Sequence, residues 1–112
     1  MISIDDFKKL EIKIGHILSV EKVEGSDKLL KLSVDFGEEK NRQIISGISA
    51  YFPDERVLVG KKCAFAANLE PRTIFGMESQ GMILAVSGLS EGETFFSLLE
   101  TSGNVAPGST VK

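Results

Sequence analysis

The chain has 112 residues, of which 42% are hydrophobic and 26% are charged, values typical of one globular domain and unlike those of a disordered chain. Its net charge of −3 and its pI near 5.2 argue against a uniformly basic nucleic-acid-binding surface. The acidic excess lies toward the two ends. Residues 41–80 are slightly basic, which leaves room for a local basic surface.

The sequence predicts a cytoplasmic protein with no membrane partner. No apolar run approaches the length of a transmembrane helix, and the N-terminus lacks the basic and apolar regions of a secretion signal. Cys63 is the only cysteine, so no internal disulfide can form, in agreement with a reducing compartment.

The residues offer no constellation for catalysis or metal binding. His16 is the only histidine, and no motif pairs it with a nucleophile. One cysteine and one histidine make no metal-ligand cluster, and Gly88-x-x-x-Gly92 lacks the Gly-Lys-Ser/Thr ending of a phosphate-binding loop. Catalysis by a carboxylate pair stays open but has no pattern to support it. We therefore predict no enzyme, no catalytic residue, no metal site and no cofactor.

A short helix is predicted at residues 3–10. Ser3 suits the N-cap, and Asp6 stands at the capping-box position in an acidic first turn. Phe7 and Leu10 share one face, which we expect to lie on the core. A basic, nucleic-acid-binding helix is the weaker interpretation, because acidic residues surround its two lysines.

From residue 11 the hydrophobic period changes to two, which predicts β-strands. In one of them Leu30, Leu32 and Val34 alternate with polar residues, as in a strand with one solvated face. The nearly continuous apolar run after Gly81 predicts a strand covered on both faces. The expected strands are 11–24, 30–36, 42–46, 62–67 and 81–87. Five short strands with small residues at the bends predict a closed antiparallel barrel, because closure removes unpaired edges.

The C-terminal residues predict a β extension beyond the barrel. Residues 94–100 form another apolar strand, and residues 104–111 continue extended. Two adjacent phenylalanines and two adjacent leucines leave apolar groups on both faces of that strand, more than one small barrel readily buries. These groups either cap the barrel or form the interface of a homodimer. We predict a single domain with three parts: a helix at 1–11, the barrel at 12–87 and a C-terminal extension at 88–112.

The polar connector that precedes the fifth predicted strand carries motifs of a known family: Asn68-Leu69-x-Pro71 and Gly76-x-x-Ser79-x-Gly81-Met82. Further motifs stand earlier, in the order expected for that family: Asp27-Lys28-Leu29, Val34-Asp35-x-Gly37 and Arg42-x-Ile44-x-Ser46-Gly47. In these motifs the chain resembles the OB-fold tRNA-binding domain of methionyl-tRNA synthetase C-termini. The same module occurs as a free-standing, β-subunit-like tRNA-binding protein and in the endothelial monocyte-activating polypeptide II group. The resemblance covers roughly residues 5–111.

This resemblance implies an all-β, five-stranded Greek-key OB-fold barrel. It also implies a non-catalytic tRNA-binding module that recognises tRNA by shape and backbone and acts with, or as part of, methionyl-tRNA synthetase. The family's C-terminal extension supports a homodimer. In this architecture nucleic acid binds around the second and third strands and the adjacent loops. The RNA-binding residues expected on that surface are Lys28, Lys31, Arg42, Ser46, Asn68, Arg72, Ser79 and Met82.

Two departures from the family pattern reduce the positive charge of this surface. Glu70 stands where the family often has Lys, and Phe75 where it often has a basic residue. The alternative is a peptide-binding, secretion-type chaperone on the same dimeric fold, for which the acidic charge is easier to explain. The intact motifs favour the tRNA-binding branch. From pattern alone, Lys28 and Lys31 also fit an ordinary solvated strand face.

Overall fold

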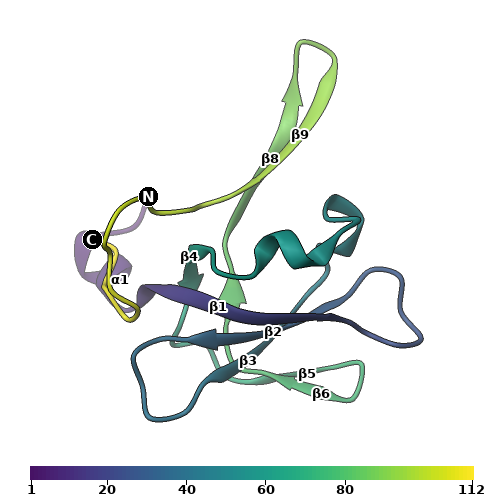
Figure 1. The fold of residues 1–112 in the computed structure, drawn as a ribbon. Helices are drawn as coiled ribbons and strands as arrows, with labels where there is room; N and C mark the ends of the chain where they lie inside the picture. The colour runs from purple at the N-terminus through teal and green to yellow at the C-terminus, as the bar shows by residue number, and fades with distance from the viewer.

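The computed structural model describes all of residues 1–112. Five antiparallel strands form one sheet in the order β3-β2-β1-β4-β7. Its two outer strands approach each other, so the sheet curls into a nearly closed barrel (Figure 1). The strands of the barrel are β1 (Ile12–Lys22), β2 (Leu30–Asp35), β3 (Arg42–Ser46), β4 (Lys62–Ala66) and β7 (Met82–Ile83). The predicted all-β, OB-like barrel is therefore confirmed.

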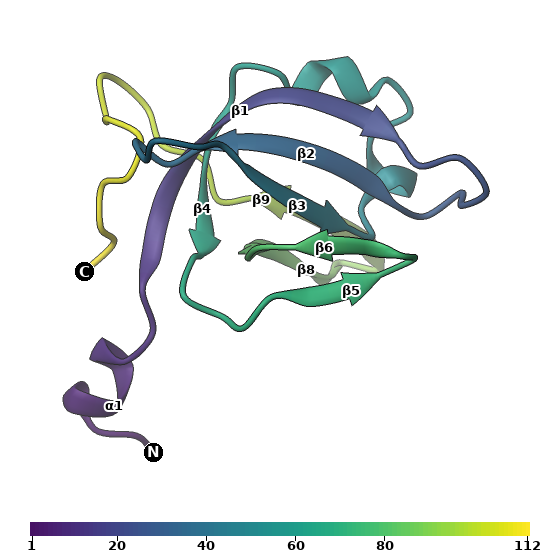
Figure 2. The same ribbon diagram turned by 90° about the horizontal axis from the view of Figure 1, so that it is seen from below.

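Two antiparallel hairpins lie outside the barrel sheet. The first, β5 (Arg72–Ile74) with β6 (Met77–Ser79), runs beside β3 (Figure 2). The second, β8 (Ala85–Ser90) with β9 (Glu93–Leu98), projects away from the barrel as a two-stranded arm (Figure 1). Between β3 and β4 the chain makes two 3-10 helices, η1 (Ser49–Tyr51) and η2 (Glu55–Leu58).

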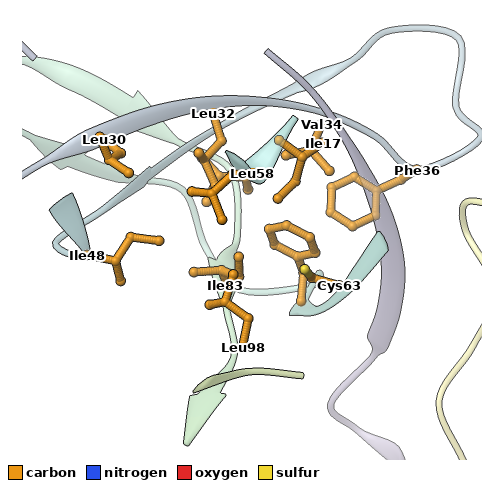
Figure 3. Close-up of a cluster of buried hydrophobic side chains, with 12 residues drawn as sticks. Ile17, Leu30, Leu32, Val34, Phe36, Ile48, Leu58, Cys63, Ile83 and Leu98 are labelled. Atoms are coloured by element: carbon orange, nitrogen blue, oxygen red, sulfur yellow. The ribbon is translucent and has the colours of Figure 1, made fainter. Parts of the chain in front are cut away.

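The barrel encloses one apolar core, to which every barrel strand contributes (Figure 3). Phe36 packs edge-to-face on Phe65, with ring centroids 5.2 Å apart. A Cβ atom on Gly15 would lie only 2.5 Å from Val34, so no larger residue fits there. Burying each large apolar side chain stabilises the fold by about 1.5–3 kcal/mol. The core residues are Ile17, Leu30, Leu32, Val34, Phe36, Ile44, Ile48, Leu58, Cys63, Phe65, Ile83 and Leu98.

The C-terminal segment covers strand edges that the barrel leaves open. Ile14 N donates to Ser109 O at 2.9 Å on β1, and Ala64 N donates to Leu99 O at 2.9 Å on β4. Gly108 has a φ of 88°, and a Cβ there would lie 2.3 Å from Phe36 O, so this position requires glycine. The segment is thus part of the folded domain.

The predicted N-terminal helix forms, but it does not lie on the core. Helix α1 spans Ile4–Lys8, and Ser3 caps it by accepting a hydrogen bond from Asp6 N at 3.1 Å. None of its residues is buried, because the helix lies away from the barrel, near the C-terminus (Figures 1 and 2). Leu10, expected on the core, is exposed. This helix is too short to span a membrane.

The prediction of one fully covered strand at 81–87 is wrong. Only Met82 and Ile83 pair with β4, whereas residues 85–87 belong to β8, whose residues are all exposed. The reason lies at Ala64. Leu84 N donates to Ala64 O, but Ala64 N donates to Leu99 O, so the C-terminal segment takes the rest of that edge.

Candidate nucleic-acid interface

Two polar segments flank the outer surface of β2 and β3. One is the turn between β1 and β2, and the other is the β5–β6 hairpin, which lies along β3 (Figure 2). At the hairpin tip the Phe75 ring lies 3.6 Å from the position of a Cβ built on Gly25, so the two segments meet there. Nearly all predicted RNA-binding residues lie in or beside these segments.

Arg42 uses its guanidinium group inside the protein. Nε and Nη2 each donate to the Glu38 carboxylate at 2.8 Å, and Nη1 donates to the carbonyls of Ala67 and Gln80. The hydrogen bonds from Arg42 hold the pKa of Glu38 below its ordinary value, and those to Glu38 raise the pKa of Arg42. Arg42 therefore joins the β2–β3 turn, the end of β4 and the start of β7.

No strand pairs with the outer edge of β3, and hydrogen bonds with Ser79 and Gln80 satisfy its backbone groups instead. Ser79 is only 3% exposed, and its hydroxyl accepts from Ile45 N at 3.0 Å and donates to Gly81 O at 3.1 Å. Gln43 N donates to Gln80 Oε1 at 3.1 Å, and Gln80 N donates to Gln43 O at 2.8 Å. These bonds pair the edge groups of β3 and fix the β5–β6 hairpin against it.

Asn68 also acts between segments distant in sequence. Its Oδ1 accepts from Glu11 N at 2.7 Å, and its Nδ2 donates to Lys9 O at 2.7 Å. The neighbouring Ala67 N donates to Glu11 O at 2.8 Å. Asn68 thus fixes the junction between α1 and β1 to the end of β4. Whether Arg42, Ser79 and Asn68 also touch RNA stays a prediction.

The other five predicted residues lie at or near the surface in two groups. Arg72 and Met82 share a small depression, of about 50 Å³, beside the β5–β6 hairpin. Lys28 is exposed in the β1–β2 turn, Lys31 lies on the outer face of β2, and Ser46 is half-buried at the end of β3.

Most basic side chains are already paired with a carboxylate. Lys31 Nζ, for example, lies 3.3 Å from Glu21 Oε2. On the predicted surface, Lys28 and Arg72 are the cations that make no ion pair within 4.0 Å. The paired basic residues are Lys9, Lys13, Lys22, Lys31, Arg42, Arg56 and Lys61. The positive charge available for phosphates is therefore small and local.

Sequence reasoning did not identify a polar row across the outer face of the sheet. Ser19 on β1 pairs with Ser33 on β2, and Ser33 pairs with Gln43 on β3. Together with Lys31 they line a groove of about 280 Å³. The alternation of buried and polar residues in β2 predicts that Ser33 lies on the outer face of the sheet. A register shift between Ile17 and Ser19 interrupts the alternation in β1, so a strict period of two does not predict on which face Ser19 lies.

Comparison with known proteins agrees with this architecture. The model of a family described as "Putative tRNA binding domain" matches residues 12–110. The chain belongs to this tRNA-binding domain family. The residues that join the β5–β6 hairpin to β3 lie within the matched range.

The tRNA-binding domain is also similar to segments of methionine–tRNA ligases. It is 45% identical over 111 residues to the ligase of Lactococcus lactis subsp. lactis (strain IL1403), covering 98% of the domain and 16% of the ligase. For the ligase of Methanocella arvoryzae the identity is 46% over 112 residues, covering 99% and 15% respectively. The chain thus spans about a sixth of the length of these curated relatives.

Solved structures give the same result for the fold. The crystal structure of a MetRS-related protein from Pyrococcus horikoshii has a TM-score of 0.87 and 35% identity, covering 100% of the tRNA-binding domain and 98% of that chain. The chaperone CsaA from Bacillus anthracis str. Ames has a TM-score of 0.81 at 23% identity, covering 100% and 99%. At that identity the likeness concerns the fold alone.

Proposed function

We propose that the tRNA-binding domain is a non-catalytic module that holds folded tRNA, mainly through shape and backbone contacts. The family match over residues 12–110 carries this proposal. The rigid attachment of the β5–β6 hairpin to β3 supports it, because a pre-formed surface loses little conformational entropy on binding. A duplex-like RNA surface offers phosphates and 2′-hydroxyls to such a site rather than a readable base sequence.

Lys28 and Arg72 are the proposed phosphate contacts, because neither is held by a carboxylate of the domain. Lys31 can join them once phosphate replaces Glu21. Met82 is 47% exposed beside Arg72 and offers an apolar contact. Ser46 lies near enough to the surface to supply a hydrogen bond. Arg42, Asn68 and Ser79 support binding by holding the surface in shape.

The partner we propose is methionyl-tRNA synthetase. The chain matches about a sixth of several methionine–tRNA ligases, so a module of this kind exists within longer synthetase chains. Either as part of such a chain or as a separate subunit, it would raise the local concentration of tRNA at the catalytic domain. Action in the cytoplasm stays a prediction from the sequence.

We further propose that the domain forms a homodimer through the β8–β9 hairpin. This arm presents apolar side chains to solvent, including Leu89, which is 69% exposed, together with Val86 and Phe95. It is anchored to the barrel by Tyr51 and Phe96, whose rings stack 3.9 Å apart. A second copy would cover the apolar groups and the unpaired strand edges.

Substitution of the two unpaired cations tests the proposed site. Lys28→Ala with Arg72→Ala should weaken tRNA binding and lower the magnitude of the log affinity–log salt slope by about 1.4–1.8, because two phosphate contacts are lost. The matched control is Lys8→Ala with Lys112→Ala, which removes the same charge far from the site. Fluorescence anisotropy with labelled tRNA measures both quantities. Equal losses in the two double variants would show that the site lies elsewhere.

A peptide-binding chaperone is the second candidate, favoured by the exposed apolar arm and the net negative charge. An apolar groove between two copies would accept extended, unfolded segments. Suppression of client aggregation by a domain that does not bind tRNA at low salt would establish this function in place of the first.

A further inference from the structure

Phe75 occupies a backbone position that is unfavourable for a bulky side chain. It and Gly76 form the two-residue turn of the β5–β6 hairpin, where Ile74 pairs with Met77. Both turn residues have positive φ, 53° for Phe75 and 78° for Gly76. Such turns favour Asn-Gly or Asp-Gly, and an aromatic residue in this region is strained. Strain of this kind concentrates at functional sites.

The same side chain is placed in solvent rather than in the core. Phe75 is 60% exposed and takes no part in the core cluster. Its ring lies along the opening of a groove of about 480 Å³, between the β5–β6 hairpin and the β1–β2 turn. The fold therefore bears both backbone strain and a largely exposed ring at this tip, because the contact of Phe75 with the β1–β2 turn near Gly25 leaves most of the ring in solvent.

The other residues of the groove define what it can hold. Met77 and Val23 add apolar surface beside the ring, whereas Glu21 and Glu24 add carboxylates. Lys22 also lines the groove, but its ammonium group is paired with Glu55 at 3.7 Å. The two carboxylates disfavour a phosphate beside the ring, so the ring faces a neutral group. Lys31, paired with Glu21 at 3.3 Å, lies at the edge of the groove, where a phosphate attached to that group can reach it.

A nucleobase meets each of these requirements. Its flat face stacks on an aromatic ring, and an exocyclic amine donates a hydrogen bond to a carboxylate. We propose that Phe75 is a stacking platform for one unpaired base of bound RNA, and that Glu24 accepts a hydrogen bond from the amine of that base. This inference rests on the proposed tRNA-binding function, to which it adds a preference for single-stranded, amino-bearing bases.

The structure allows a test in which folding and binding change in opposite directions. Phe75→Asn places a favoured residue in the turn, so the free energy of unfolding should rise while tRNA affinity falls roughly five- to a hundredfold. The salt slope should not change, because no phosphate contact is lost. The matched control is Glu91→Asn, since Glu91 has a φ of 52° in the turn of the other hairpin. It should gain stability and keep its affinity.

The identity of the base is tested with two single-stranded decamers, oligo(C) and oligo(U). Cytosine carries an exocyclic amine at C4, whereas uracil carries a carbonyl there and a proton on N3. The domain should bind oligo(C) severalfold more tightly, and Glu24→Ala should remove the difference. Equal binding of both decamers would overturn the role of Glu24.

The outcomes separate this inference from the function on which it rests. If the unmodified domain binds tRNA and Phe75→Asn binds it equally well, the stacking platform is wrong and the proposed function stands. A domain that binds no tRNA at low salt would overturn both. Equal losses of affinity in Phe75→Asn and Glu91→Asn would also overturn the platform, because the effect would then belong to hairpin turns in general.

Discussion

Arg42, Asn68 and Ser79 belong to motifs that resemble an RNA-binding family, yet their polar groups bond within the domain. Each of them joins segments that are distant in sequence, and together they fix the β5–β6 hairpin and the end of β4 around β3. At these positions the motif therefore encodes the shape of the surface. The contacts with RNA that we propose are made by neighbours such as Lys28 and Arg72.

Ser79 provides a direct measure of this structural role. Ser79→Ala leaves the amide of Ile45 without its partner in a buried place, which should lower the free energy of unfolding by about 1–3 kcal/mol. Ser46→Ala, at the half-buried end of β3, should change the free energy of unfolding by less than about 0.5 kcal/mol. Urea denaturation measures both. Equal small effects would mean that the Ser79 hydroxyl does not hold the hairpin.

The Glu38–Arg42 pair predicts a pH dependence of stability. Hydrogen bonds from Arg42 hold the pKa of Glu38 below its value of about 4.5 in the unfolded chain. The pair should therefore contribute fully above pH 4.5, and its contribution should disappear as the pH falls through the lower folded-state pKa. Because Glu38 is 41% exposed, we expect less than about 1 kcal/mol.

Thermal unfolding between pH 7 and pH 3 measures this contribution. Glu38→Gln should be less stable than the unmodified domain at pH 7, and the difference should shrink on acidification. A difference that stays constant, or grows, at low pH would contradict the assigned pKa shift.

Among the elements, local sequence patterns predicted β1 to β4, but they predicted neither the β5–β6 hairpin before β7 nor the separation of β7 from β8. The alternation in β2 and the polar turns are local signals. From them the sequence correctly predicted both that β2 forms and which of its side chains are buried. The split between β7 and β8 depends on Leu99 reaching Ala64, a contact between distant segments that no period can reveal. The β5–β6 hairpin was missed because Phe75-Gly76 is not a usual turn pair.

The β8–β9 arm gives a prediction about assembly. Val86→Lys with Leu89→Lys places one charge on each face of β8, at two exposed apolar positions, and should shift the proposed dimer to monomers. Glu91→Lys, at the tip of the same arm, should leave it dimeric. Sedimentation velocity over a range of protein concentrations distinguishes these states. An unmodified domain that is monomeric at high concentration would contradict dimerisation through this arm.

At the scale of the whole molecule, the buried thiol reports on opening of the barrel. Cys63 lies fully inside the core, and burial raises its pKa to about 11. Because the thiolate is the reactive form, labelling by a thiol reagent at pH 8 should proceed only as fast as the domain unfolds. Labelling in urea should follow the unfolding transition. Rapid labelling of the native domain would show that β4 opens locally.

The net negative charge of the domain is the property that is hardest to reconcile with binding of an RNA. The sequence shows the negative total, but only the structure shows which cations are neutralised, since ion pairs such as Lys31–Glu21 join different strands. It also shows that Lys28 and Arg72 make no such pair. Binding through few phosphate contacts and a pre-formed surface is the account that fits both observations.

The salt dependence of tRNA binding is the decisive test of binding through so few phosphate contacts. Anisotropy titrations with folded tRNA and with a plain RNA duplex should show preference for tRNA, with a log–log slope of about −1.4 to −2.7, corresponding to two or three neutralised phosphates. No binding of tRNA at low salt, or equal binding of the duplex with a much steeper slope, would contradict it.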